Sequence, residues 1–152
     1  MDLKIALLQI TPGKSLEENR IKGEAACRKA KEMGADIALF PEMFSNGYDI
    51  YDRPPSVWQK EAIGEESDFV RFFAFLAKEL DMAIAITYLE KHDPSPRNSM
   101  ILFDRFGEKR FSYAKVHTCD FGEEKHLTPG DDFFVATLST RLGPVQVGGM
   151  IC

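Results

Sequence analysis

Residues 3–40 alternate between short apolar runs and one amphipathic run, and this order constrains the fold more than any other feature of the sequence. Leu3 to Ile10 is almost wholly apolar, as expected for a strand that is covered on both faces. Ser15, with Glu18 three residues later, is typical of a capping box that opens a helix, and Gly34 predicts its end. Asp36 to Phe40 predicts the next strand. A strand, a helix and a strand in this order predict two parallel strands joined by a right-handed crossover.

The rest of the chain continues this α/β pattern and then changes to hairpins. We expect a second helix over 67–80, because Phe69, Phe72, Phe73, Leu76 and Leu80 share one helical face. The predicted strands are 83–90, the hairpin pair 99–103 and 109–116, and a final pair at 133–138 and 144–151. Residues 41–55 and 117–132 are predicted as loops. These elements together predict an α/β layered domain with a mixed sheet.

Composition narrows the class of protein. Of 152 residues, 44% are hydrophobic and 28% are charged, which is typical of a soluble globular domain. The net charge is −5 and no basic stripe occurs, so we expect no nucleic-acid or membrane partner. The N-terminus lacks the pattern of a signal peptide, and no segment is long and apolar enough to span a membrane. The 3 cysteines are widely spaced, which predicts reduced thiols and a cytoplasmic location.

Three chemically active side chains are placed where predicted strands end. Glu42 follows the strand at 36–40, Lys115 lies near the end of the strand at 109–116, and Cys152 follows the last strand. A carboxylate can accept the proton of a thiol, and an ammonium favours both the thiolate and a developing oxyanion. The set is sufficient for acyl transfer at a carbon–nitrogen bond, although spacing alone does not show that the three converge.

The segments around these residues resemble the three motif blocks of the nitrilase superfamily of carbon–nitrogen hydrolases. The blocks are Phe-Pro-Glu-Met-Phe at 40–44 with Gly-Tyr at 47–48, Tyr-Ala-Lys-Val-His at 113–117, and Gly-Gly-Met-Ile-Cys at 148–152. They occur in the family's order and roughly at its spacing, and the resemblance covers residues 3–152. Gln9 and the segment Arg97-Asn98-Ser99 fit as well.

The resemblance implies a four-layer α-β-β-α sandwich, assembled as a dimer or larger homo-oligomer. Residues 1–152 would be the N-terminal part of a single domain whose C-terminal remainder is absent, because the second half of the family's sandwich follows the nucleophile. The family's oxyanion hole uses a backbone N–H from just after that residue. We therefore expect the isolated fragment to be inactive, since the loss of one such donor costs on the order of 10²–10³ in rate.

The resemblance also implies a role for each site residue. Glu42 would be the general base, Lys115 would stabilise the tetrahedral intermediate, and Cys152 would be the attacking thiolate. A second family glutamate lies upstream of a Pro-Gly pair, here Pro129-Gly130. Glu123 fits it best and Glu124 is the alternative; either would position the substrate and support proton transfer.

The implied reaction is hydrolysis of a small linear amide or carbamoyl compound, with release of ammonia and a thioester intermediate. No metal or organic cofactor is implied. Tyr48 and Phe44 are candidates for lining the substrate pocket, with packing as the alternative. A nitrile substrate is the second choice, and an inactive truncated fragment is the third.

Two rival interpretations come from other classes. Potential zinc ligands gather in one polar stretch, but their spacing matches no zinc motif: His117, Cys119, Asp120, Glu123, Glu124 and His126. The other rival is a non-catalytic binding or assembly module with idle motif residues. Loss of activity on alkylation, rather than on chelation, would distinguish the cysteine enzyme from the zinc enzyme.

Overall fold

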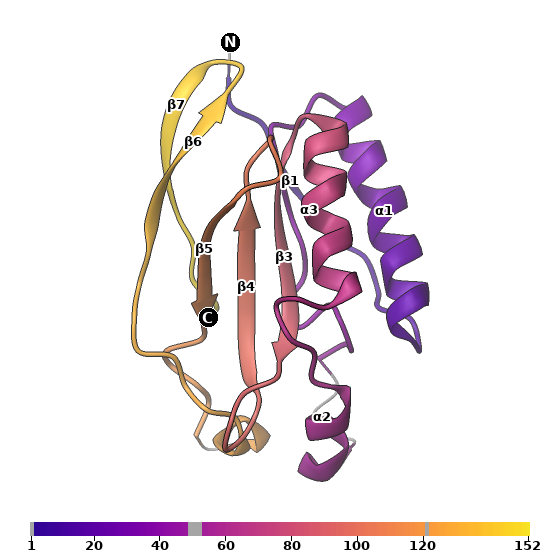
Figure 1. Ribbon diagram of the computed structural model, residues 1–152, viewed down its shortest axis with the longest axis vertical. Helices are drawn as coiled ribbons and strands as arrows, with labels where there is room; N and C mark the ends of the chain where they lie inside the picture. Colours follow the sequence, from indigo (N-terminus) through magenta and orange to yellow (C-terminus); the bar gives the residue numbers. More distant parts are fainter. Residues whose placement is uncertain (1, 49–52, 121) are drawn as a thin grey trace.

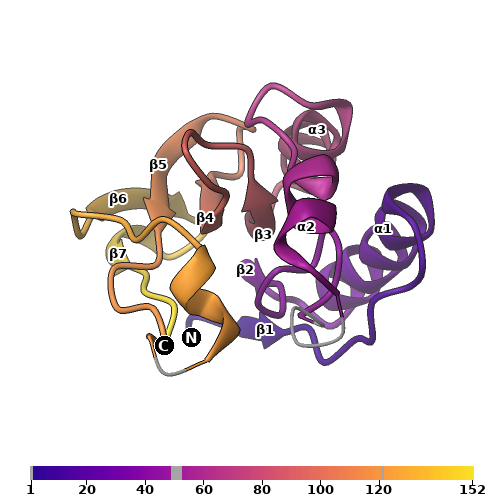
Figure 2. The same ribbon diagram turned by 90° about the horizontal axis from the view of Figure 1, so that it is seen from below.

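The chain forms a mixed sheet with helices on one face and a β-hairpin on the other (Figures 1 and 2). A computed structural model describes residues 2–48, 53–120 and 122–152. Parts of the predicted loops, residues 49–52 and 121, lie outside the described residues. The elements, in chain order, are β1 Ile5–Leu7, α1 Leu16–Glu32, β2 Ile37–Leu39, α2 Pro55–Glu61, α3 Asp68–Leu80, β3 Ala83–Glu90, β4 Arg97–Phe103, β5 Lys109–Ala114, the 3₁₀ helix η1 Glu123–His126, β6 Val135–Thr140 and β7 Gly143–Gly148.

The larger sheet has the strand order β1-β2-β3-β4-β5. β1, β2 and β3 are parallel to one another, whereas β3, β4 and β5 form an antiparallel meander. β6 and β7 pair as a separate antiparallel sheet. The predicted βαβ unit, the hairpin and the final strand pair are therefore confirmed, and so is the mixed sheet.

Local capping explains where α1 begins. The backbone N–H of Glu18 donates to the Ser15 hydroxyl at 3.2 Å, as the capping box predicts. The Glu18 carboxylate accepts instead from the backbone N–H of Lys14, at 2.9 Å, and so reaches one residue further than in a standard box. Gly34 lies just past the helix with a φ of 80°, a backbone conformation that favours glycine.

Two apolar cores lie on opposite faces of the larger sheet. On the helical face, α1 and α3 bury a core against β3 that includes Cys27, Phe73, Leu76 and Ile84. On the other face, the β6–β7 hairpin covers a second core that includes Phe111, Tyr113 and Leu138. The predicted apolar stripe of α3 faces the first core, so helical periodicity gave the correct orientation of this helix.

Two local predictions were wrong, and one short helix, α2, was not predicted. Ile5 and Leu7 of β1 are 54% and 64% exposed, whereas Ala6, which points to the other face, packs against the helical-face core, so this strand is covered on one face and not on both. Residues 55–61 form α2, which starts with a proline and buries Trp58. The predicted loop at 117–132 contains η1. Short helices of this kind depend on tertiary contacts, and a single sequence contains little local signal for them.

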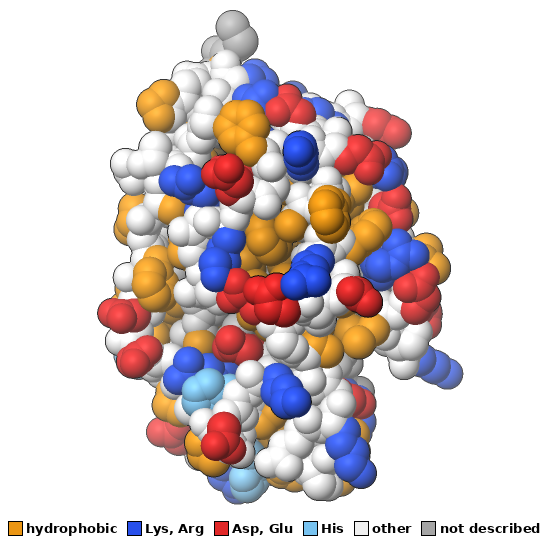
Figure 3. All heavy atoms as spheres, viewed as in Figure 1, with side chains coloured by type: hydrophobic (Ala, Val, Ile, Leu, Met, Phe, Trp, Pro, Cys, Tyr) orange, Lys and Arg blue, Asp and Glu red, His pale blue; other side chains and the backbone are white. Residues whose placement is uncertain are grey.

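The surface carries charges of both signs. Acidic and basic side chains are interspersed on the face shown in Figure 3. Several of them form ion pairs, and the one between Arg28 and Glu79, at 2.8 Å, joins α1 to α3. Within the described residues, every helix is too short or too polar to cross a bilayer.

Candidate active site

The topology brings the ends of three strands together at one end of the sheet. β2 is parallel to β3, β3 is antiparallel to β4, and β4 is antiparallel to β5, so the carboxyl ends of β2 and β5 lie beside the amino end of β4. This end of the sheet is the lower one in Figure 1. Glu42, Asn98 and Lys115 lie at these strand ends, which is where a rigid sheet can hold functional side chains together.

Lys115 lies at the centre of the site. Its Nζ is 3.0 Å from Oε1 of Glu42 and 2.9 Å from Oε1 of Glu124. The Lys115 side chain is 2% exposed and that of Glu124 is fully buried, whereas Glu42 remains 31% exposed. Burying an ammonium is costly unless it is paired, so the two carboxylates are what makes a lysine tolerable here. An ammonium has three N–H donors, and two of them are used by these carboxylates.

The environment favours the charged forms of both buried partners. Burial acts to lower the pKa of Lys115, but hydrogen bonds to Glu124 and Glu42, together with their negative charges, raise it above its ordinary value of 10.5. Burial acts to raise the pKa of Glu124. Hydrogen bonds from the Cys119 backbone N–H, the Tyr48 hydroxyl and Lys115 outweigh that effect and lower the pKa below 4.5. The site therefore holds an ionised carboxylate and an ammonium in direct contact.

Glu42 is positioned by a loop that is fastened to β3. The Thr87 hydroxyl accepts from the backbone N–H of Phe44 at 3.2 Å and donates to the carbonyl oxygen of Pro41. Thr87 thus holds the chain on both sides of Glu42. Met43, the next residue, has a φ of 51°, which is uncommon for a residue other than glycine. Strained backbone of this kind persists where surrounding contacts over-determine it, and it occurs often at functional sites.

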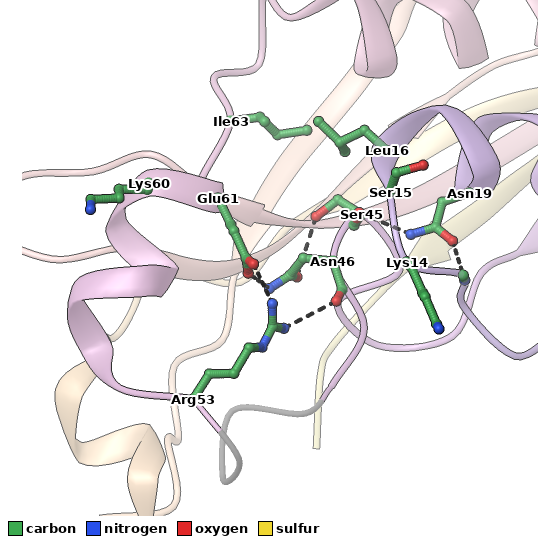
Figure 4. A pocket seen from close by; sticks show the side chains of 11 residues that line it. Lys14, Ser15, Leu16, Asn19, Ser45, Asn46, Arg53, Lys60, Glu61 and Ile63 are labelled. Carbon is green, nitrogen blue, oxygen red and sulfur yellow. Dashed lines mark hydrogen bonds and ion pairs between the residues drawn. The ribbon is translucent and has the colours of Figure 1, made fainter.

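The same loop is fastened on its other side by polar side chains that Figure 4 shows. Asn19 of α1 donates to the carbonyl oxygen of Ser45 at 3.1 Å. Asn46 donates to Glu61 of α2 at 3.3 Å, and Arg53 bonds both Glu61 and the Asn46 carbonyl oxygen. A cavity of about 170 Å³ lies among these residues, but neither Lys115 nor the two carboxylates that it contacts line it. Its residues support the Glu42 loop.

Glu124 is positioned by a close approach between its loop and β5. The backbone N–H of Gly130 donates to the carbonyl oxygen of Lys115 at 2.9 Å. A Cβ atom at Gly130 would lie 2.3 Å from the carbonyl oxygen of Ala114, so the loop can come this near only with glycine there. The Cys119 backbone N–H then donates to Oε2 of Glu124 at 2.7 Å. The Pro-Gly pair of the sequence motif therefore has a steric reason.

A small apolar core joins the two carboxylate-bearing segments. Its buried members are Met43, Trp58, Leu89 and Leu127, which come from the Glu42 loop, α2, β3 and the end of η1. We call this set the lower core. Trp58 is fully buried in it, and its ring lies 6.2 Å from that of His126. The unpredicted helix α2 thus serves to pack the loop after β2 against η1.

The predicted site residues are only partly brought together. Glu42 and Lys115 are in contact, but the glutamate that completes the cluster is Glu124, the alternative, and not Glu123. The side chain of Glu123 is 37% exposed and lies 3.8 Å from His126. Adjacent residues of a 3₁₀ turn point in different directions, so only one of the two glutamates can face Lys115.

The two predicted pocket residues have different surroundings. The Tyr48 hydroxyl donates to Oε1 of Glu124 at 2.7 Å, so Tyr48 belongs to the cluster. Phe44 is fully buried in the helical-face core, with its ring 4.8 Å from that of Phe40. Its prediction as a pocket-lining residue is not supported, because a side chain enclosed by core residues presents no surface to a ligand.

Cys152 is exposed and follows β7 on the face of the sheet opposite the helices (Figure 2). In the part of the chain that the structure describes, its thiol makes no hydrogen bond to Glu42, Lys115 or Glu124. Sequence reasoning noticed Asn98 only as part of a motif segment. The structure shows that its side-chain amide, which is 1% exposed, donates to Oε1 of Glu42 at 2.6 Å.

The rival zinc set is not assembled in the structure. No group of three His, Cys, Asp or Glu side chains is arranged to hold a metal ion within residues 2–48, 53–120 and 122–152. Glu124, the most buried of the predicted ligands, is already bonded by Lys115, Tyr48 and the Cys119 backbone.

Comparison with known proteins gives a consistent picture. The sequence model of the carbon–nitrogen hydrolase family matches residues 4–152. An N-carbamoylputrescine amidase of Oryza sativa subsp. japonica is 27% identical over 96% of this chain and 49% of its own length. A nitrilase of Pyrococcus abyssi is 30% identical over 99% of this chain and 55% of its own length.

A solved structure of an amidase from Nesterenkonia sp. has a similar fold. It superposes with a TM-score of 0.80 at 27% identity, covering 99% of this chain and 55% of that chain. The chain thus spans about half the length of these relatives.

Proposed function

Because the chain belongs to the carbon–nitrogen hydrolase family, we propose that the protein is an amidase that releases ammonia from a small linear amide or carbamoyl compound. Family membership and the amidase-type relatives support the general activity. The proposal goes further in naming the substrate class, a thioester intermediate and the residues that carry the reaction.

One observation supports the mechanism most directly: a buried ammonium contacts two carboxylates, at 3.0 and 2.9 Å, at the end of the sheet where the motif segments of Glu42 and Lys115 meet. Lys115 has one N–H donor left after these two contacts. We assign that donor to the carbonyl oxygen of the substrate. A donor that is already oriented when negative charge develops on this oxygen lowers the barrier without reorganisation.

The proposed reaction has two halves. Glu42 takes the proton of the Cys152 thiol, and the thiolate attacks the carbonyl carbon. The carbon–nitrogen bond breaks as the nitrogen takes the proton from Glu42. Ammonia departs, and the acyl group remains on Cys152 as a thioester. Water then attacks the thioester while Glu42 accepts its proton, which releases the acid and restores the thiol.

We propose Glu124, rather than Glu123, as the second active-site glutamate. Its carboxylate accepts a hydrogen bond from Lys115, and this bond together with those from Tyr48 and the Cys119 backbone N–H favours its ionised form. With Glu42 and Glu124 both bonded to Lys115, the ammonium is fixed in direction and cannot rotate away from the substrate.

The activity is proposed for the protein at the length of its relatives. For residues 1–152 alone we propose no turnover, because the face of β1 that carries Ile5 and Leu7 is open and, among the described residues, the Cys152 thiol makes no hydrogen bond to Glu42, Lys115 or Glu124. A homo-oligomer, as the family resemblance implies, is part of the proposal and is measured by light scattering.

The test is a substrate panel on the full-length protein, with release of ammonia as the readout. Short linear amides and carbamoyl compounds should be hydrolysed, Cys152→Ala should abolish turnover, and intact-mass spectrometry should detect an acyl adduct on the wild-type protein. Cys119→Ala is the matched control and should leave an adduct at Cys152. Turnover that survives Cys152→Ala would exclude the mechanism.

A nitrile substrate is the second candidate, and the observation behind it is the 30% identity to the Pyrococcus abyssi nitrilase. Attack of the same thiolate on a nitrile carbon needs the same three residues. Aliphatic nitriles therefore belong in the panel, and a kcat/KM that is higher for nitriles than for the matching amides would favour this candidate.

A further inference from the structure

We propose that Asn98 is a positioning residue that gives the two carboxylate oxygens of Glu42 different tasks. Oε1 is held as a fixed acceptor, and Oε2 is left as the oxygen that exchanges protons. The inference rests on the proposed function, since it concerns the residue assigned there as the base.

The hydrogen bonds of Glu42 are strongly one-sided. Oε1 accepts from Nδ2 of Asn98 at 2.6 Å and from Nζ of Lys115 at 3.0 Å. Oε2 receives no hydrogen bond from any of the described residues. An oxygen with two donors at these distances has its lone pairs engaged, whereas the other oxygen can still accept a proton. The geometry therefore distinguishes two oxygens that are chemically equivalent in a free carboxylate.

Asn98 is well placed to impose this difference. It lies in β4 and is 1% exposed, so its side chain has little freedom to move. Its backbone carbonyl oxygen accepts from the backbone N–H of Lys115 at 2.8 Å. A single residue thus fixes the backbone that carries the ammonium and the carboxylate that the ammonium contacts. Because an ionised carboxylate only accepts, the amide must present its NH₂ group to Glu42.

The other half of the Asn98 amide argues against a purely structural role. Its Oδ1 is buried and has no hydrogen-bond partner among the described residues. A buried unsatisfied acceptor destabilises a fold, so an apolar side chain of similar shape would suit this position better if stability were all that mattered. The hydrogen bond to Glu42 is the contact that an apolar side chain could not make, and it gives a reason for an asparagine at this position.

Two substitutions of similar size test the proposal in the full-length protein. Asn98→Leu removes the donor, and Asn98→Asp replaces it with a second negative charge beside Glu42. We expect Asn98→Leu to lower kcat by roughly tenfold and to leave KM within about twofold, since loss of one hydrogen bond to a charged group costs at least this much. Asn98→Asp should lower kcat further.

The readout that a structural role would not move is the titration of Glu42 itself. The carboxyl carbon of Glu42 can be followed by ¹³C NMR against pH and assigned with Glu42→Gln. Removing a donor to the ionised form should move the midpoint upward in Asn98→Leu, and like-charge repulsion should move it further in Asn98→Asp. This measurement does not need turnover, so it separates the role of Asn98 from the proposed amidase activity.

Ser99→Ala is the matched control. Ser99 is the next residue of β4, is fully buried, and donates to Glu90 at 2.7 Å, so the Ser99→Ala substitution also removes a hydrogen bond to a glutamate. This substitution should lower the melting temperature but leave kcat and the Glu42 titration unchanged. A Glu42 titration that is the same in wild type, Asn98→Leu and Asn98→Asp would overturn the proposal. So would a shift of equal size in Ser99→Ala.

Discussion

Replacing Glu124 by glutamine should destabilise the protein far more than the same change at its neighbour Glu123. All three partners of Glu124 are donors: Lys115 and Tyr48 at Oε1, and the Cys119 backbone N–H at Oε2. A glutamine side chain offers one oxygen and one NH₂ group. Whichever way it turns, the NH₂ group faces a donor and the charge that balances the buried ammonium is lost.

The size of the effect follows from burial. Breaking a buried ion pair by removing one partner costs about 3–5 kcal/mol. Lys115 keeps its contact with Glu42, so we expect the lower end, about 3 kcal/mol of unfolding free energy. No discount for solvent screening applies, because the two side chains are 2% and 0% exposed. Glu123→Gln changes a partly exposed group and should stay within about 0.5 kcal/mol.

Urea denaturation of the full-length protein, followed by circular dichroism, measures the difference. At a slope of about 2 kcal/mol per molar urea, the midpoint should fall by roughly 1.5 M in Glu124→Gln and by less than about 0.3 M in Glu123→Gln. A midpoint that moves as far in Glu123→Gln as in Glu124→Gln would contradict the assignment of the buried carboxylate.

Three further predictions concern pH, packing and thiol reactivity. The lowered pKa of Glu124 contributes stability above pH 4.5 that is lost as pH falls through the folded value, so wild type should lose stability more steeply than Glu124→Gln in acid denaturation. Gly130→Ala should cost about 1–3 kcal/mol in urea denaturation, while Gly64→Ala, whose Cβ would have 3.9 Å to its nearest neighbour, should cost little; equal midpoints would refute the steric argument. Burial raises the pKa of the Cys27 thiol to about 12, so iodoacetamide at pH 8 should label the exposed Cys152 and spare Cys27, as peptide mass spectrometry would show.

The strongly periodic elements were predictable because their signals are local. The cap at Ser15 and the apolar stripe of α3 depend on residues within a few turns of each other, and the predicted strand at 83–90 has the same bounds as β3. By contrast, Trp58 of α2 is packed between segments that are distant from it in sequence. No local pattern contains that information.

The sequence indicated which residues belong to the site but not which of their side chains contact one another. Motif spacing indicated Glu42 and Lys115, and the structure joins them. Two adjacent glutamates could not be separated from sequence, because only the turn of η1 decides which one faces inward. The role of Asn98 could not be predicted for another reason: an asparagine near the start of a strand gives no sign that its amide contacts a carboxylate 56 positions earlier.

The lower core links the two acidic segments mechanically. Met43 directly follows one carboxylate, Leu127 lies just beyond the other, and Trp58 and Leu89 are packed with both. A substitution that shifts one of these segments should therefore shift the other as well. The positions of the two carboxylates that contact the Lys115 ammonium are thus coupled through this core. Any redesign of the site should therefore keep these four side chains unchanged.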